Sequence, residues 1–233
     1  MDTGSSGEAK FDAYAQDYST LHQESVAASG EPSDYFARYK LACLERWLKP
    51  QLESPVLDFG CGTGSLTRHL VHRCSEVHGY DPSQQSLHEA RKGSPEATFF
   101  NAASELSDGH YGLAVLSGVL HHVPPAERLN VLSVVHSKLA PGSGRLVVFE
   151  HNPLNPLTRK AVADCPFDDD AVLLWPREAK RLLRNAGFRN VKRHFIVFFP
   201  RLLASLRGLE PYLGACPLGA QMMLIGTKPA AHP

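Results

Sequence analysis

A glycine-spaced turn at residues 60–64 restricts the fold of this chain more than any other feature. The residues before it, 56–59, are apolar except for Asp58 and favour a strand, and residues 66–73 after it follow a helical pattern. Because glycine has no Cβ, the three glycines of the turn can adopt positive φ and let the backbone approach a ligand closely. The first turn of the following helix adds free N–H groups and the positive end of its dipole. The sequence therefore predicts a polar ligand across a strand–turn–helix junction.

The spacing of the glycines indicates the class of ligand. Nicotinamide-binding turns have the spacing G-x-G-x-x-G, whereas this turn reads G-x-G-x-G, with Asp58 two residues before its first glycine. A second carboxylate, Asp81, ends another apolar run about twenty residues later, where it can accept hydrogen bonds from both hydroxyls of a ribose. A third landmark is the segment 116–123, with the sequence LSGVLHHV. The spacing of the glycines disfavours an NAD-dependent oxidoreductase.

Together, the glycine turn, Asp81 with Pro82, and the segment 116–123 resemble the motifs of small-molecule, class I S-adenosylmethionine (SAM)-dependent methyltransferases. The resemblance covers residues 55–227 and implies SAM as cofactor. It also implies an α/β, Rossmann-like sheet of seven mostly parallel strands in the order 3-2-1-4-5-7-6, with helices on both faces, and the alternation of strand and helix patterns predicts a parallel sheet independently. Cofactor contacts are expected from Asp58, Gly60, Cys61, Gly62, Asp81, Pro82, Ala103, Ser104, Ser117 and Gly118.

One position departs from the family pattern. Relatives often place an aspartate that binds the adenine amino group two residues after the third strand, and Ala102 stands there in this chain. Adenine recognition is then expected from backbone groups and side chains around Asn101, Ala103 and Ser104.

The chain before the first strand is expected to form a separate helical segment. Residues 1–9 are small and polar and are predicted to be disordered. Residues 10–50 carry apolar and aromatic side chains at helical spacing. In proteins that this chain resembles, such a segment folds over the cofactor as a lid, and residues 51–229 would then form the SAM-binding domain.

The tyrosines of this lid have two interpretations. Their three- and four-residue steps suit a helix that packs on a core. Alternatively, Tyr14 and Tyr18 face the cofactor sulfonium, whose positive charge an aromatic face or a phenol oxygen stabilises, and Tyr18 takes part in catalysis. By position, Tyr35 and Tyr39 would contact the acceptor.

The other candidate catalytic residues are His121, His151 and Asn152. His121 or His122 can serve as a general base, because an imidazole titrates near neutral pH, or can pack structurally. His151 and Asn152 follow the strand predicted over residues 145–150, whose carboxyl end is where an open α/β sheet places its ligands. We expect both to contact the acceptor. The alternative is that they hold their loop together by turn hydrogen bonds.

Two further segments are interpreted as structural, and no metal is expected. The three aspartates at 168–170 predict a solvated turn or helix cap, because the sequence shows no matching set of ligands. The five cysteines are scattered and lack metal-finger spacing. The apolar segment 200–219 suits a lid, a dimer surface or a core helix, and we expect the core helix.

Composition limits the partners. The 233 residues have a formal net charge of zero, so no long-range field attracts the chain to nucleic acid or to a membrane surface. No apolar run is long enough to span a bilayer, and the N-terminus lacks a secretory signal. We expect a cytoplasmic monomer or homodimer that acts on a small molecule.

The expected reaction is methyl transfer to a small molecule of specialised metabolism by SN2 attack at the sulfonium carbon. The cofactor supplies the chemistry and the protein supplies alignment, so no protein nucleophile is required. One alternative is an intramolecular cyclase, in which the amine of SAM attacks its own Cγ, releases methylthioadenosine and forms azetidine-2-carboxylate. Another is a non-catalytic, SAM-binding regulatory module.

Overall fold

The computed structural model describes residues 23–230, which are built around one seven-stranded sheet. Its order is β3-β2-β1-β4-β5-β7-β6, with parallel pairs from β3 to β5 and with β7 antiparallel to both of its neighbours. The predicted order and the mostly parallel sheet are confirmed. The strands are β1 (Val56–Phe59), β2 (Val77–Tyr80), β3 (Thr98–Phe100), β4 (Leu113–Ser117), β5 (Arg145–His151), β6 (Arg189–Ile196) and β7 (Gln221–Thr227).

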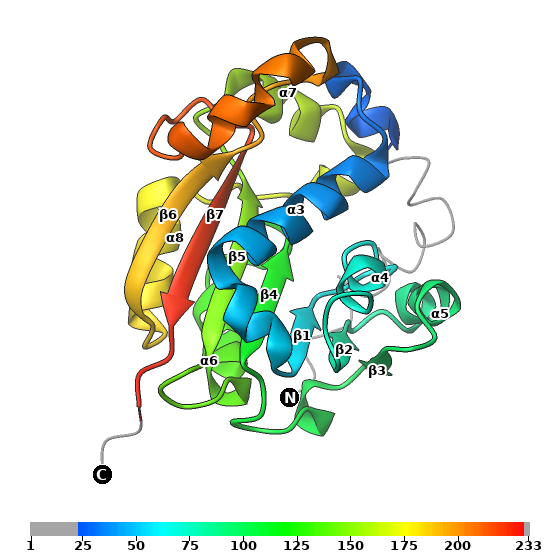
Figure 1. Ribbon diagram of the computed structural model, residues 1–233, viewed down its shortest axis with the longest axis vertical. Coiled ribbons are helices and arrows are strands. Elements are labelled where there is room, and N and C mark those ends of the chain that lie inside the picture. Colours follow the sequence, from blue (N-terminus) through cyan, green and yellow to red (C-terminus); the bar gives the residue numbers. More distant parts are fainter. Residues whose placement is uncertain (1–22, 231–233) are drawn as a thin grey trace.

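Helices cover both faces of the sheet, as predicted (Figure 1). Leu44 of α3 and Leu70 of α4 belong to the buried cluster on one face, and Leu132 of α6 and Leu183 of α8 belong to the cluster on the other. The α-helices are α3 (Ser33–Leu48), α4 (Thr67–Leu70), α5 (Gln84–Gly93), α6 (Arg128–Lys138), α7 (Pro156–Ala163) and α8 (Pro176–Asn185). The 3₁₀ segments are η1 (Ala27–Ser29), η2 (Lys49–Glu53), η3 (Ala103–Glu105), η4 (Pro166–Asp168) and η5 (Arg201–Tyr212).

The central strands are buried on both faces, which explains their nearly continuous apolar sequences. Successive residues point to opposite sides, so Val56 packs in the cluster under α3 whereas Leu57 packs in the cluster under α6. The carboxyl ends of β1, β4 and β5 meet at one edge, so the turns that follow them lie side by side. Open α/β sheets bind their ligands at this edge.

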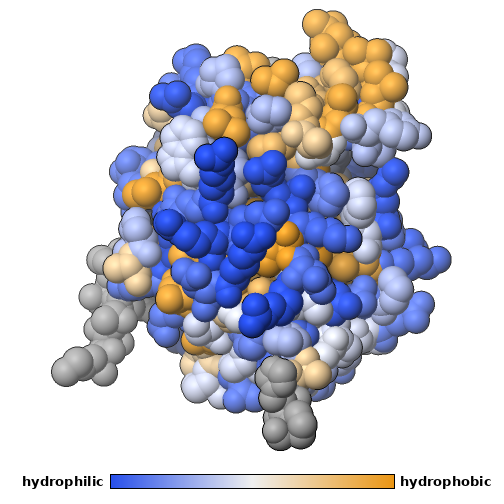
Figure 2. Space-filling model, turned by 90° about the vertical axis from the view of Figure 1, so that its left-hand side faces the viewer, coloured by the Kyte–Doolittle hydropathy of each residue, from blue (hydrophilic) through white to orange (hydrophobic). Residues whose placement is uncertain are grey.

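Two predicted elements differ in the structure. α4 is shorter than the helix expected over residues 66–73, because turns take up the residues on either side of it. The expectation of a core helix within 200–219 is wrong. η5 interrupts its helical geometry at Leu203 and contains Pro211, and it leaves its leucines exposed, with Leu202 at 93%. Figure 2 shows apolar side chains gathered at the top of the molecule, at the height where Figure 1 places η5.

The predicted disordered segment 1–9 and the first part of the predicted lid lie outside the described residues, and so do Tyr14 and Tyr18. The division into a lid (10–50) and a SAM-binding domain (51–229) stays a prediction. Within residues 23–230, no helix has both the length and the apolar character needed to cross a bilayer.

Candidate active site

The glycine turn follows β1 at the ligand edge of the sheet. Gly60, Gly62 and Gly64 have φ of 78°, 52° and 77°, as the turn geometry requires. Their surroundings differ. A Cβ on Gly60 would lie 2.6 Å from Val119 Cγ2, whereas a Cβ on Gly62 would meet nothing within 4 Å among the described residues. Gly60 is therefore needed for packing, and Gly62 borders open space that a ligand can fill.

Asp81 lies against this turn. Its Oδ2 accepts a hydrogen bond from the Gly62 N–H at 2.8 Å, and its Oδ1 accepts one from the Ser83 N–H at 2.9 Å. Pro82 beside it is exposed, and Ser83 caps α5 through a 3.0 Å bond from the Ser86 N–H to its Oγ. The carboxylate and the glycine turn, which are predicted to bind one ligand together, are thus neighbours.

One carboxylate oxygen of Asp58 receives no hydrogen bond from the described part of the chain. The residue is 1% exposed, and its Oδ2 accepts a 2.6 Å bond from Thr67 Oγ1, while its Oδ1 is buried with no hydrogen-bond partner in the described part of the chain. Burial raises the pKa of Asp58 to about 6. An orphaned buried carboxylate oxygen is rare, and a positively charged ligand group would satisfy it. Burial also holds the pKa of Cys61 in the turn well above its usual range, so this thiol is neutral and not a nucleophile.

Lys40 is a residue of this edge that the sequence reasoning missed. It projects from α3, and its Nζ donates a 2.8 Å hydrogen bond to Ser117 Oγ at the end of β4. Burial lowers the pKa of Lys40 to about 8. Its position gave a signal, because it falls four residues after buried Phe36 and four before buried Leu44, on the apolar stripe of the helix.

His121 is buried between two carboxylates. Its Nδ1 lies 2.6 Å from Glu150 Oε2, and Glu150 Oε1 accepts a 2.7 Å bond from the Leu120 N–H. Burial opposes the charge of this imidazole, but the carboxylates of Glu150 and Asp168 outweigh burial and raise the pKa of His121 to about 9. His121 is therefore protonated at neutral pH, which argues against the predicted role as general base.

Asp168 is the second of these carboxylates, and for this residue the interpretation as a solvated turn is wrong. It is 7% exposed, and its Oδ1 lies 3.3 Å from His122 Nε2 and 3.6 Å from His121 Nε2. These three residues form a group with metal-ligand geometry, contrary to the expectation that no matching ligands accompany the aspartates. Sequence reasoning missed this group because 46 residues separate His122 from Asp168.

Buried Arg128 explains how the Asp168 segment reaches the histidines. It is 1% exposed, and it donates from Nε to the Val123 carbonyl at 3.0 Å and from Nη2 to the Val172 carbonyl at 2.5 Å. The Val172 N–H in turn donates to the His121 carbonyl at 2.8 Å. α6 thereby ties the segment after η4 to the loop after β4.

His151 and Asn152 do not act together. The His151 ring lies 5.0 Å from the His121 ring, and burial, aided by the charge of His121, lowers the pKa of His151 to about 4, so it is neutral. Asn152 is fully buried, and its Nδ2 donates to the Pro217 and Gly219 carbonyls at 2.9 and 2.7 Å. The predicted acceptor contact of Asn152 is corrected, because side chains alternate along the chain as it leaves β5 and both amide hydrogens hold the loop before β7.

Tyr35 and Tyr39 face η5. The Tyr39 hydroxyl donates to Glu210 and accepts a 3.4 Å bond from the Val197 N–H, so its hydrogen is already engaged. The guanidinium of Arg207 lies 4.6 Å from the centroid of the Tyr35 ring. These contacts give both tyrosines an anchoring role between α3 and η5. The acceptor contact predicted for them stays a prediction.

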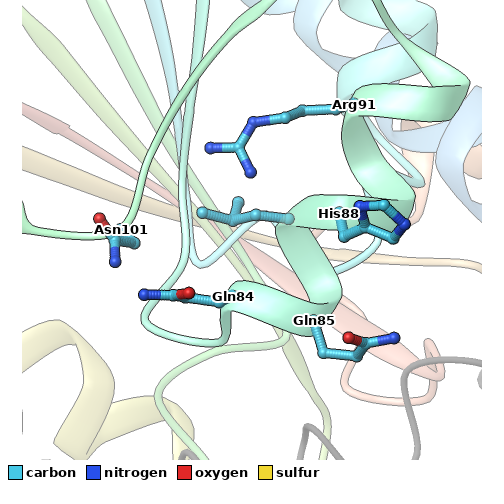
Figure 3. Close-up of a pocket in the computed structure, with 6 residues that line it drawn as sticks. Gln84, Gln85, His88, Arg91 and Asn101 are labelled. Atoms are coloured by element: carbon cyan, nitrogen blue, oxygen red, sulfur yellow. The ribbon is translucent and has the colours of Figure 1, made fainter.

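A separate hollow of about 550 Å³ lies between α5 and the end of β3. Arg91, Gln84 and Asn101 point into it, and Gln85 and His88 lie at its rim (Figure 3). Ala103 and Ser104, which follow in η3, are half-buried and exposed respectively. Their predicted adenine contact stays a prediction.

Comparison with known proteins identifies the family. Residues 33–196 match a family model described as a methyltransferase domain. The chain belongs to this methyltransferase family. A methyltransferase of Synechocystis sp., itself uncharacterised, is 31% identical over 145 residues, which span 60% of this chain and 68% of that protein. The trans-aconitate 2-methyltransferase of Mycobacterium ulcerans is 29% identical over 172 residues, which span 68% of this chain and 63%, less than two thirds, of that enzyme.

The fold of this methyltransferase is also found in solved structures. A SAM-dependent methyltransferase of Thermotoga maritima, described as a possible histamine N-methyltransferase, matches with a TM-score of 0.69 at 19% identity and covers 95% of this chain and 99% of its own. The predicted resemblance to class I SAM-dependent methyltransferases is confirmed, and with it the Rossmann-like fold and SAM as the cofactor.

Proposed function

We propose that this methyltransferase binds SAM across the glycine turn and transfers its methyl group to a small anionic acceptor by SN2 attack at the sulfonium carbon. When bound, the cofactor supplies an activated methyl group. The residues of this chain bind and orient it. In this proposal the ribose hydroxyls donate to Asp81, and the backbone at Gly62 leaves the space in which the nucleoside lies.

The observation that carries the proposal is a pair of opposite charges at the ligand edge. Asp58 has an orphaned oxygen, and the cation of Lys40 reaches Ser117. The methionine end of SAM is a zwitterion, so its ammonium group suits Asp58 and its carboxylate suits Lys40. Burial makes both protein charges costly without a partner, and the bound zwitterion would compensate each of them.

The proposed acceptor class follows from the protonation state of His121. His121 already carries its proton, so it cannot take one from an alcohol or an ammonium group. A carboxylate oxygen needs no base, because it is already a nucleophile at neutral pH. The similarity to a trans-aconitate 2-methyltransferase agrees with an acceptor of this kind.

Incubation of the purified protein with SAM and a panel of small di- and tricarboxylic acids, followed by mass spectrometry, tests the proposal. We expect a methyl ester and S-adenosylhomocysteine with at least one acid, and no product with the matching amides. Methylthioadenosine formed from SAM alone would show the cyclase reaction instead. Calorimetry with S-adenosylhomocysteine checks the cofactor site separately from the choice of acceptor.

A further inference from the structure

The group formed by His121, His122 and Asp168 offers three ligand atoms to one point. Two imidazole nitrogens and a carboxylate oxygen lie within 4.8 Å of one another. His121 and Asp168 are buried, and the His122 side chain is 14% exposed. The three residues come from the loop after β4 and from η4, and the buried side chain of Arg128 joins that loop to the segment that follows η4.

The spacing of these atoms is compatible with a bound metal ion. Asp168 Oδ1 lies 3.3 and 3.6 Å from the two Nε2 atoms, beyond the usual hydrogen-bond range of about 2.7–3.2 Å. In a tetrahedral site with metal–ligand bonds of about 2.0–2.2 Å, neighbouring ligand atoms are about 3.3–3.6 Å apart. The observed separations match that edge length.

Glu150 provides the outer partner that a metal-binding histidine requires. Its Oε2 lies 2.6 Å from His121 Nδ1, and its Oε1 is held by the Leu120 N–H. Ligating histidines usually donate their second ring N–H to a carboxylate, which fixes the tautomer and turns the other nitrogen to the metal. Here the arrangement directs His121 Nε2 towards Asp168.

The charge of the group also favours a cation. Glu150 and Asp168 are buried carboxylates, and the ion pairs that the structure shows for Asp168 are with histidines, not with lysine or arginine. A divalent cation would balance the charge of these carboxylates.

We propose that His121, His122 and Asp168 bind one divalent first-row transition metal of the zinc type, with Glu150 as the residue that orients His121. Two imidazoles and one carboxylate suit such an ion, whereas magnesium and calcium prefer oxygen ligands alone. The ion takes the place of the Nε2 proton of His121, which leaves to solvent. Three protein ligands keep one tetrahedral position for water or an acceptor oxygen. The His121 ring borders Gly118, where a Cβ would lie 3.5 Å from it, so the site adjoins the segment assigned to the cofactor.

Cobalt(II) and zinc titrations of tag-free, chelator-treated protein test this proposal. We expect one ion per chain, a visible cobalt spectrum of tetrahedral type, and a higher melting temperature with zinc. Asp168→Asn, which preserves the side-chain shape, and His122→Gln should each weaken metal binding about 100-fold or more, and Glu150→Gln should weaken it about 10- to 100-fold. Circular dichroism of each variant without metal verifies folding.

The matched control is His110→Ala. Glu76, His78 and His110 form a second group with ligand-like spacing, but it is more exposed and lies at the opposite end of the strands. This variant should bind metal like the unchanged protein. Absence of stoichiometric binding to the unchanged protein would overturn the proposal, whatever the variants do. Loss of binding in His110→Ala with retention in Asp168→Asn would overturn it as well. Calorimetry with S-adenosylhomocysteine on metal-free protein keeps this result separate from the proposed SAM site.

Discussion

The glycine turn and the histidine group lie at the same edge of one sheet, but the chain builds them in different ways. The turn takes its parts from one short stretch, residues 58–64, and from Asp81, which directly follows the adjacent strand β2. The histidine group joins residues 121–122 to Glu150, which the pairing of β4 with β5 places nearby, and to Asp168, which no strand pairing brings there. A site built from local sequence is held by its backbone conformation, whereas a site built from distant segments depends on buried side chains. Variants can separate these two kinds of support.

The largest effect is expected for Arg128→Ala, which removes the side chain that joins the segment after η4 to the loop after β4. Two carbonyls lose their donor and a buried volume empties, so we expect a loss of about 3–5 kcal/mol in the free energy of unfolding. Urea denaturation measures it. The control is Arg38→Ala, an exposed arginine paired with Asp34 one helical turn away, which should change stability by no more than about 0.5 kcal/mol. Equal effects of the two variants would refute the role of Arg128 as the tie.

The next largest effect concerns the glycine turn, where substitutions of Gly60 and Gly62 should differ in their effects on stability and on ligand binding. Gly60→Ala places a Cβ 2.6 Å from Val119 at positive φ, so we expect about 2–3 kcal/mol of destabilisation. Gly62→Ala meets open space and should cost only about 1 kcal/mol of backbone strain, yet it should lower the affinity for S-adenosylhomocysteine at least tenfold. Denaturation and calorimetry together measure both quantities. Unchanged affinity in Gly62→Ala would show that the ligand does not approach this residue.

A smaller effect concerns Asp58 and Lys40, the opposite charges of the proposed cofactor site. Burial raises the pKa of Asp58 to about 6, although the hydrogen bond from Thr67 opposes this shift. The carboxyl group must be ionised to accept a hydrogen bond from an ammonium group. Burial lowers the pKa of Lys40 to about 8, although the charge of Glu150 opposes this shift. The amine must be protonated to pair with a carboxylate. The affinity for SAM should therefore be highest between pH 6 and pH 8 and fall about tenfold per pH unit outside this window.

Calorimetry across the pH range measures that profile, and two variants assign its limbs. Asp58→Asn should remove the acid limb. Lys40→Met should remove the part of the alkaline limb that belongs to the protein, and what remains reports the amino group of the cofactor. A profile that is flat between pH 5 and pH 9 would exclude both assignments.

The smallest effect lies outside both regions. Tyr39→Phe removes the hydroxyl that donates to Glu210, which still accepts from the Phe198 and Phe199 N–H groups at 3.1 Å. We expect a loss of about 1 kcal/mol in stability and no change in the KM of the acceptor. A raised KM with unchanged stability would restore the sequence-based prediction that Tyr39 contacts the acceptor.

The sequence predictions were accurate for features built from local sequence and inaccurate for features built from distant segments. The order of the sheet, the glycine turn and the position of Asp81 were predictable because they depend on local pattern and on parallel pairing. Asp168 was misinterpreted because its burial depends on a segment held by Arg128, and short-range pattern does not show such a tie. Asn152 was misassigned because the direction of one side chain at a strand end depends on where the distant loop at Pro217 and Gly219 lies.

Lys40 differs, since its signal was present in the sequence. A lysine between Phe36 and Leu44 on the apolar stripe of a helix is at least half-buried, and a cation partly removed from water needs a partner. The leucines of η5 show the opposite case, in which the sequence suggests burial and the structure leaves the side chains exposed. Their apolar character predicted burial, but a segment with Pro211 and an interruption at Leu203 does not present one continuous face to the core.

The reversed strand β7 has a consequence for synthesis on the ribosome. It lies between β5 and β6, so the edges of these two strands stay open until residues 221–227 have left the exit tunnel. A nascent chain that stops earlier presents two unpaired strand edges, which are templates for aggregation. Closure of the sheet in this enzyme therefore waits for the synthesis of β7, which follows all the other strands that the structure describes.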